Sequence, residues 1–138
     1  MVKDILAEKG IVVERACAAD LPPVLVDADK MRQVFLNILR NAHEALEPGG
    51  RISIACDAVK AGGRPMVRVR IADNGPGIPD HVRPNVFEPF FTTKTSGFGL
   101  GLPNARKIVE QHSGAIHLGR KRGRGTSFIV LIPAEEAS

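Results

Sequence analysis

The sequence contains no tryptophan, no tyrosine and only two cysteines, Cys17 and Cys56. Few rings therefore remain for stacking on nucleic-acid bases, and we expect the six phenylalanines to be mostly structural. The cysteines form no CxxC motif, so we expect them to be small buried side chains in a reducing compartment. No apolar run is long enough to cross a membrane, and residues 1–4 do not begin a signal peptide. These absences predict a cytoplasmic location.

The overall composition is that of a globular domain. The length of 138 residues suits one hydrophobic core, and an apolar content of 43% is ordinary for such a domain. The net charge is +4, with a basic cluster at residues 120–124 that is interleaved with glycine and lies between two strand-like runs. A solvated hairpin turn explains this cluster better than a nucleic-acid patch, so we expect no nucleic-acid partner. An anionic ligand such as a nucleotide accounts for the basic balance equally well.

Hydrophobic periodicity predicts the order of the elements. Two helices are expected at 29–46 and 103–113, the first capped by Asp27 or Asp29. The predicted strands cover residues 11–17, 24–26, 51–56, 66–72, 116–118 and 127–132. This order predicts an α+β fold with helices on one face of a mixed, mostly antiparallel sheet. Residues 1–10 are interpreted as the tail of a preceding helix or a linker, 11–133 as one domain and 134–138 as a C-terminal tail.

The predicted helix at 29–46 has two different faces. Its polar stripe carries Asn37 and Asn41, one turn apart, although asparagine is a mediocre helix former. Their amide oxygens suit a hard cation such as Mg²⁺, but on the evidence of this helix alone two solvated amides are the simpler explanation. The apolar stripe predicts the core contacts of the helix and contains Met31, Val34, Phe35, Ile38, Ala42, Ala45 and Leu46.

The loop at 73–79 follows a predicted strand and begins with a carboxylate, Asp73. Its glycines permit a left-handed backbone or close approach by a ligand, and its prolines stiffen the turn. A rigid, open loop beside one fixed acceptor suits a flat polar ligand. Taken alone, the loop is better explained as a plain strand-to-loop turn with an Asx-type cap.

A second glycine-rich loop, at 97–102, leads into the predicted helix at 103–113. Backbone N–H groups and the helix dipole at such an N-terminus favour phosphate. The loop is neither a P-loop, because GxxxxGK[ST] occurs nowhere, nor a GxGxxG motif, because Leu102 stands where its third glycine would be.

Four blocks in order resemble the ATP-binding catalytic domain of sensor histidine kinases, within the superfamily of gyrase, the heat-shock chaperone ATPases and MutL. Residues 37–45, 73–79, 87–94 and 97–102 are similar to its N, G1, F and G2 boxes. The resemblance covers about residues 24–133. It implies a two-layer α/β sandwich of the Bergerat type.

The resemblance also implies roles for individual residues. Asp73 would accept a hydrogen bond from the exocyclic amine of adenine, Gly77 would let the base lie against the loop, and Thr126 would reach the same edge of the base. Asn41 would hold Mg²⁺, and Lys94 would touch the phosphates unless it is a solvated loop lysine. The remaining nucleotide-binding positions are Gly75, Gly97, Gly99, Leu100, Gly101 and Leu102.

Position 37 separates the classes of this superfamily. In the water-activating members, a glutamate one turn before the Mg²⁺ asparagine is the general base. Here that position is Asn37, and a neutral amide cannot take a proton from water. We therefore expect slow hydrolysis and transfer of the γ-phosphoryl group to a histidine, with Asn37 and Lys94 as the candidate catalytic residues.

The substrate histidine is expected on a dimerisation helix outside this chain, because none of its four histidines lies in the required context. The expected partners are ATP, Mg²⁺, the dimerisation and histidine-phosphotransfer domain of the same protein, and the receiver domain of a response regulator. We expect this chain to be monomeric and its parent to be a homodimer, with or without a membrane anchor. Two alternatives stay open: a serine kinase of the anti-sigma type, which shares the boxes, and a nucleotide-binding or scaffolding module without chemistry.

Overall fold

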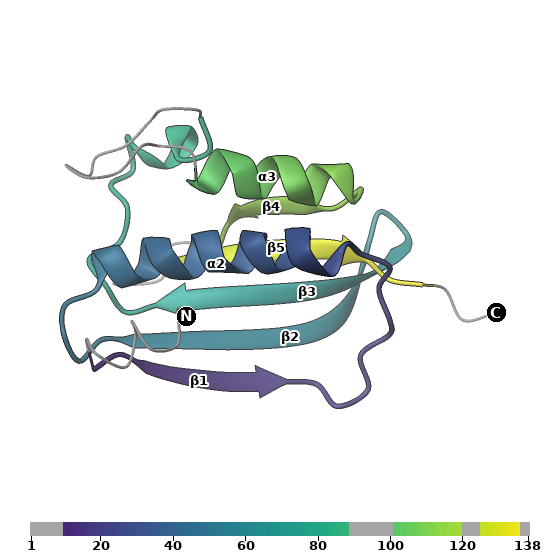
Figure 1. The fold of residues 1–138 in the computed structure, drawn as a ribbon, viewed down its shortest axis with the longest axis horizontal. Helices are drawn as coiled ribbons and strands as arrows, with labels where there is room; N and C mark the ends of the chain where they lie inside the picture. Colours follow the sequence, from purple (N-terminus) through teal and green to yellow (C-terminus); the bar gives the residue numbers. More distant parts are fainter. Residues whose placement is uncertain (1–9, 89–100, 120–124, 136–138) are drawn as a thin grey trace.

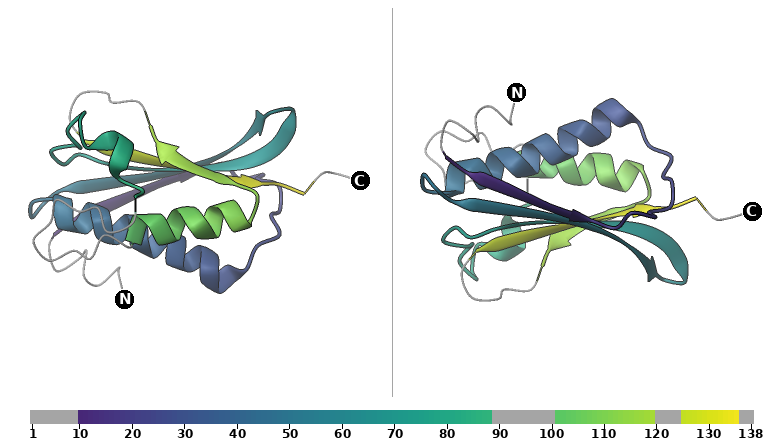
Figure 2. Two further views of the ribbon diagram at one scale, coloured as in Figure 1. Left: turned by 90° about the horizontal axis from the view of Figure 1, so that it is seen from above. Right: turned by 90° about the horizontal axis from the view of Figure 1, so that it is seen from below.

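The computed structural model describes residues 10–88, 101–119 and 125–135. Two helices lie on one face of a sheet whose strand order is β1-β2-β3-β5-β4, so the described part of the chain forms two layers (Figures 1 and 2). The predicted fold class is confirmed. The elements are β1 Val12–Cys17, α2 Ala28–Ala45, β2 Arg51–Ala61, β3 Arg64–Asp73, the 3-10 helix η1 Arg83–Asn85, α3 Gly101–Gln111, β4 Ala115–Leu118 and β5 Thr126–Pro133.

The sheet is mixed and mostly antiparallel, as predicted. Strand β1 runs parallel to β2, whereas β2 with β3, β3 with β5 and β4 with β5 are antiparallel. The turn between β2 and β3 contains Gly62 and Gly63, both with positive φ. The pairing of β3 with β5 places the end of β3 beside the beginning of β5. The predicted loop at 73–79 starts at this end of β3.

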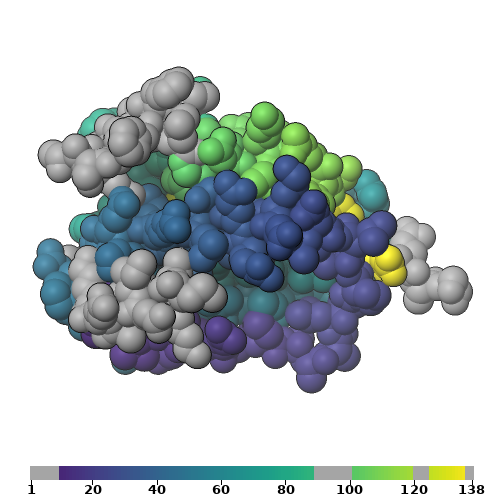
Figure 3. Space-filling view, in the orientation of Figure 1, coloured from purple at the N-terminus to yellow at the C-terminus, as the bar shows by residue number. Residues whose placement is uncertain are grey.

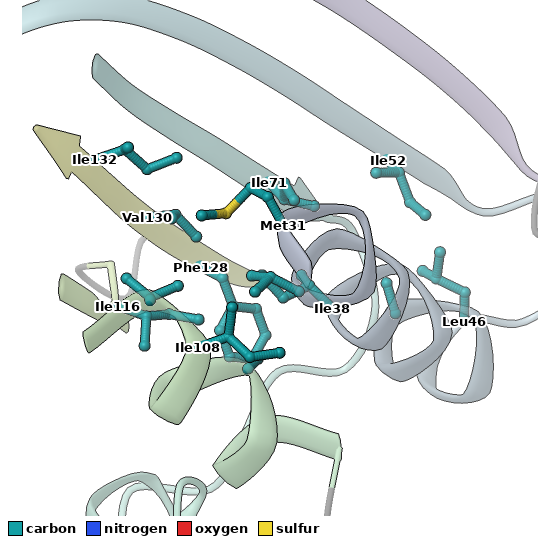
Figure 4. Close-up of a cluster of buried hydrophobic side chains, with 14 of the residues drawn as sticks. Met31, Ile38, Leu46, Ile52, Ile71, Ile108, Ile116, Phe128, Val130 and Ile132 are labelled. Atoms are coloured by element: carbon teal, nitrogen blue, oxygen red, sulfur yellow. The ribbon is translucent and has the colours of Figure 1, made fainter. Parts of the chain in front are cut away.

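The hydrophobic core lies between the sheet and the two helices (Figure 4). Val34 and Ile38 of α2 are fully buried, as are Ile52 of β2 and Val130 of β5. Phe128 of β5 is the largest fully buried side chain of the described residues. The predicted apolar stripe of α2 therefore faces the core, with Phe35 and Ala45 half-buried at its borders. In Figure 3, α2 and α3 lie side by side over the sheet.

The start of α2 is held by two kinds of contact. Of the two candidate caps, Asp27 is the residue used: its side chain accepts a hydrogen bond from the backbone N–H of Lys30 at 3.1 Å. The backbone N–H of Asp27 donates to Nε2 of His112 at 3.1 Å. The other ring nitrogen, Nδ1, lies 2.8 Å from the carbonyl oxygen of Ile108, so the neutral tautomer with hydrogen on Nδ1 satisfies both contacts. His112 thus ties the end of α3 to the beginning of α2.

Several predicted boundaries differ from the structure. Residues 24–26 form no strand, because Val24 makes only an isolated bridge with Ala134. Strand β2 continues past residue 56 because its pairing with β3 extends to the glycine turn. Helix α3 begins at Gly101 and ends at Gln111, earlier than predicted at both ends.

The prediction that both cysteines are buried is wrong. Cys17 is exposed and Cys56 is half-buried. The reason is the position of β1 at the edge of the sheet, where all six of its residues are exposed. The apolar and β-branched residues at 11–13 predict a strand correctly and do not reveal that it is an edge strand.

Candidate functional site

Residues from distant blocks meet at one end of the sheet. Asp73 is the last residue of β3, and it pairs directly with Thr126, the first residue of β5. The C-terminal end of α2 and the N-terminal end of α3 lie at the same end of the molecule (Figure 1). The fold therefore brings the predicted loop at 73–79 and the start of α3 to one region.

The carboxylate of Asp73 is half-buried and held by backbone groups. The N–H of Gly75 donates to its Oδ1 at 2.9 Å, and the backbone of Thr126 also donates to it. Burial raises the pKa of Asp73 above its usual range, and the two backbone hydrogen bonds oppose that rise. The result is an oriented acceptor in a partly dehydrated place, where a ligand with a matching donor gains most.

The surface beside Asp73 is formed by glycine backbone. Gly77 has φ +84°, and a Cβ there would lie 3.1 Å from the carbonyl oxygen of Gly125. Gly125 has φ +108°, and a Cβ there would overlap the carbonyl oxygen of Asp73. Gly75 is buried, with space for a Cβ limited by Oδ1 of Asp73 at 3.1 Å. Because side chains are excluded at these positions, a flat ligand can approach the backbone closely.

Two residues of this region were not predicted. Gly125 packs against the backbone of Asp73, and the only sequence signal for it is a glycine two residues before a predicted strand. Asn74 fixes the loop to the beginning of β2: its Oδ1 accepts from the N–H of Arg51 at 2.8 Å, and its own N–H donates to the Arg51 carbonyl at 3.2 Å. An asparagine directly after a strand is a recognisable Asx-type signal. Both residues stabilise the position of Asp73.

A second wall is formed where α2 meets α3. A Cβ at Gly101 would lie 3.9 Å from Cβ and Cγ of Asn37, so the first residue of α3 sits against that side chain. Asn37 and Asn41 are both half-buried on one side of α2, and Asn41 already makes a contact within the chain. Leu102 packs against the core, which fixes the first turn of α3. The N–H groups of that turn have no partners within the helix and favour an anion.

Some predicted site residues lie outside the described part of the chain. They are Lys94, Gly97, Gly99 and Leu100, together with the basic cluster at 120–124. Their roles stay predictions. Phe87, which precedes them, packs edge-on against Phe128 with ring centroids 6.2 Å apart, and the guanidinium of Arg106 lies 5.8 Å from the centre of its ring. Phe87 thus packs onto the core, in agreement with the expectation that the phenylalanines are mostly structural.

The amide oxygens of Asn37 and Asn41 are donors of the type that Mg²⁺ takes. Within the described ranges, no group of three or more histidine, cysteine, aspartate and glutamate side chains could hold a metal ion. A cation here would therefore need phosphate oxygens and water to complete its shell. Neither described helix is long and apolar enough to span a membrane.

The comparison with known families agrees with this geometry. Residues 26–136 match the family model of histidine kinase-, DNA gyrase B- and HSP90-like ATPases. The chain belongs to this family. The family recognised from the four blocks is thus confirmed, and the domain is the ATP-binding catalytic part of histidine kinases.

Curated relatives of this family member are sensor kinases. The chain is 39% identical over 130 residues to the sensory histidine kinase/phosphatase NtrB of Rhizobium meliloti, which covers 84% of this chain and 33% of NtrB. It is 37% identical over 117 residues to sporulation kinase E of Bacillus subtilis, which covers 85% of this chain and 15% of that kinase. The chain thus spans a third or less of the length of these two relatives.

Solved structures show the same fold. The catalytic domain of histidine kinase ThkA, in a nucleotide-free form, has a TM-score of 0.81 and 33% identity, covering 96% of this chain and 90% of that domain. Full-length ShkA in complex with AMPPNP has a TM-score of 0.81 and 31% identity, covering 99% of this chain and 29% of ShkA. The two-layer arrangement around Asp73 is therefore that of a histidine kinase catalytic domain.

Proposed function

We propose that this chain binds ATP with Mg²⁺ and donates the γ-phosphoryl group to a histidine on a dimerisation helix outside it, within a two-component signalling system. The observation that carries this proposal is the half-buried carboxylate of Asp73, fixed by the backbones of Gly75 and Thr126 beside a floor of glycine. The complex of the similar kinase ShkA with AMPPNP supports an adenine nucleotide as the ligand.

The preference for adenine follows from the chemistry of Asp73. Its carboxylate only accepts hydrogen bonds when ionised, so it pairs with the exocyclic amine of adenine. Guanine has a carbonyl oxygen at that place, and two acceptors facing each other in a partly dehydrated site would repel. Thr126, with 9% of its surface exposed, lies across from Asp73 and would reach the same edge of the base.

The phosphates would extend from Asp73 toward the wall formed by α2 and α3. Asn41 is proposed to hold Mg²⁺, which neutralises charge on the phosphates when it is bound. The N-terminus of α3 at Gly101 would donate backbone N–H groups to the same phosphates. Glycines 97 and 99 and Lys94 complete this proposed binding set.

Asn37 supports transfer to a protein side chain rather than to water. It contacts the start of α3, one turn before Asn41, and carries no group that can remove a proton from water. A neutral imidazole needs no such base, because its nitrogen lone pair can attack the γ-phosphorus directly while ADP leaves. Asn37 would then position the attacking and leaving groups. The remaining proposed partner is a receiver domain that takes the phosphoryl group from that histidine.

The test is phosphoryl transfer in the parent protein. Incubation with ATP labelled at the γ-phosphate should give a protein-bound phosphate that is stable in alkali and lost in acid. Asn41→Ala should abolish the label, and Asp29→Asn, which changes a carboxylate that is exposed on the first turn of the same helix, should leave it intact. Acid-stable phosphate would contradict the proposal and favour a serine kinase, and ATP binding without any label would favour a module without chemistry.

A further inference from the structure

The edge of the sheet carries a pair of thiols that the proposed function does not use. Sγ of Cys17 on β1 lies 2.6 Å from Sγ of Cys56 on β2. We propose that Cys17 and Cys56 form a reversible intramolecular disulfide, so that this edge of the domain is a site of redox modification.

The backbone already has the geometry that a disulfide requires. Cys17 and Cys56 are direct partners in the parallel register of β1 and β2. Neighbouring strands lie ~4.8 Å apart, which is within the ~4.4–6.8 Å range of Cα separations in disulfides. The N–H of Ala18 donates to the carbonyl of Cys56 at 3.0 Å and holds the end of β1 in this register. The strands would not have to move for the bond to form.

The two thiols differ in reactivity. Cys17 is exposed at the end of the edge strand, so an oxidant in solution can reach it. Cys56 is half-buried, and burial, with the neighbouring Cys17 adding to the effect, raises the pKa of its thiol to about 12. Cys17 is therefore the sulfur that is oxidised first, and Cys56 is the sulfur that then attacks the oxidised Cys17 to form the disulfide.

The chemistry balances with a peroxide as the oxidant. The thiolate of Cys17 attacks one oxygen of hydrogen peroxide, the O–O bond breaks, and a sulfenic acid and water result. The sulfur of Cys56 then attacks the sulfenic sulfur, the S–O bond breaks, and a second water leaves as the S–S bond forms. Two thiols lose two hydrogen atoms in total, and the peroxide is reduced to two waters. A small thiol such as dithiothreitol reverses the change by exchange.

The disulfide would close a loop that contains α2, and the bond itself would lie away from Asp73. The loop from residue 17 to residue 56 contains the whole of α2, Ala28–Ala45, so the bond removes conformational freedom from a long segment of the unfolded chain. Asp73 pairs with Ile52, whereas Cys56 pairs with Val69, four positions further along β2. At ~3.4 Å per residue this separates the two places by about 14 Å. Oxidation should therefore stabilise the domain and leave nucleotide affinity unchanged.

The test uses this chain treated with hydrogen peroxide and then analysed by intact mass and by peptide mapping without reduction. We expect a monomer lighter by two hydrogen atoms, a cross-linked peptide containing both cysteines, and a melting temperature raised by about 10 °C. Dithiothreitol should reverse both changes. ATP affinity, where it is measurable, should be equal in the two forms, so failure of nucleotide binding leaves this test intact.

Two variants control for other oxidation products. Cys17→Ser and Cys56→Ser each keep one thiol and the size of the side chain, and neither should show the mass loss or the rise in melting temperature. The proposal is overturned if the chain that retains both cysteines, after treatment with peroxide, forms only intermolecular dimers or carries separate sulfinic acids on both cysteines. A cross-linked monomer that melts at the same temperature as the reduced one would contradict the stabilisation expected from closing this loop.

Discussion

The centre of the sheet and its β1 edge differ in how much room the fold leaves for another side chain at each position. At the end of β3, Gly75 and Gly125 each lie against Asp73, and the space for a side chain at either glycine is small or absent. Along β1, all six residues are exposed. Sites that bind a ligand by backbone approach need the first kind of region, whereas thiol chemistry, which needs access, suits the second. The proposed nucleotide site and the proposed disulfide therefore lie at separate places along the sheet.

The largest effect is expected for Gly125→Ala. A Cβ at this position overlaps the carbonyl oxygen of Asp73, and the φ of +108° is strained for alanine. We expect the free energy of unfolding to fall by about 3 kcal/mol, with loss of nucleotide binding. Gly63→Ala is the matched control, because φ is +78° there and no atom lies within 4 Å of the new Cβ. Urea denaturation that gives the same loss for both variants would contradict the close packing of Gly125 on Asp73.

The second prediction concerns how the stability of the domain and its affinity for nucleotide depend on pH through Asp73. Because burial raises its pKa in the folded state, the protonated form contributes stability at low pH, and this contribution is lost as the pH rises through the raised pKa. Asp73→Asn removes that loss, so the unliganded variant should be at least as stable as the original chain at neutral pH. Nucleotide affinity, which needs the ionised carboxylate, should decline on acidification at a higher pH than an ordinary aspartate would give.

Urea denaturation and nucleotide titration at several pH values check both signs. Asp29→Asn on the exposed turn of α2 is the control, because its carboxyl group has 92% of its side-chain surface exposed. A variant at Asp73 that is less stable than the original chain throughout the neutral range would contradict the assignment of burial as the dominant cause.

A smaller effect is expected where α3 meets the beginning of α2. His112→Phe keeps a ring of similar size and removes both hydrogen bonds that His112 makes to the backbone. We expect a loss of about 1 kcal/mol in the free energy of unfolding, since the exposed N–H of Asp27 can turn to water. His117→Phe, at an exposed position on β4, should change it by much less. Equal losses in the two variants would show that the contacts of His112 carry no stability.

The smallest effect is expected on the half-exposed ion pair between β2 and β3. Arg68 makes two hydrogen bonds to Asp57, from Nε at 3.0 Å and from Nη2 at 2.6 Å. Both side chains are more than 40% exposed, so water and salt screen the pair. Asp57→Asn should lower the free energy of unfolding by less than about 1 kcal/mol, and less again at high salt. A larger, salt-independent loss would mean that this part of the sheet tolerates substitution no better than the end of β3 does.

The features that could be predicted from the sequence are those that depend on residues close together in the chain. The α2 stripe, the loop after Asp73 and the closing hairpin follow from local alternation, glycine and proline, and the structure contains all three. Gly125 and the Cys17–Cys56 contact were missed because each depends on strand pairing between distant segments. The prediction of a strand at 24–26 was wrong because a run of three apolar residues does not reveal how far its partner strand extends, and here the pairing is a single bridge.

The most direct test of the central claim is calorimetric titration of this chain and of Asp73→Asn with ATP and with GTP, in the presence of Mg²⁺. We predict saturable binding of ATP, much weaker binding of GTP, and a loss of roughly 100-fold or more in ATP affinity in the variant, as expected when a buried acceptor loses its charge. Denaturation curves would establish that the variant is folded. Equal affinity of the original chain and the variant for ATP, or no preference for ATP over GTP, would contradict the assignment of Asp73 as the residue that recognises adenine.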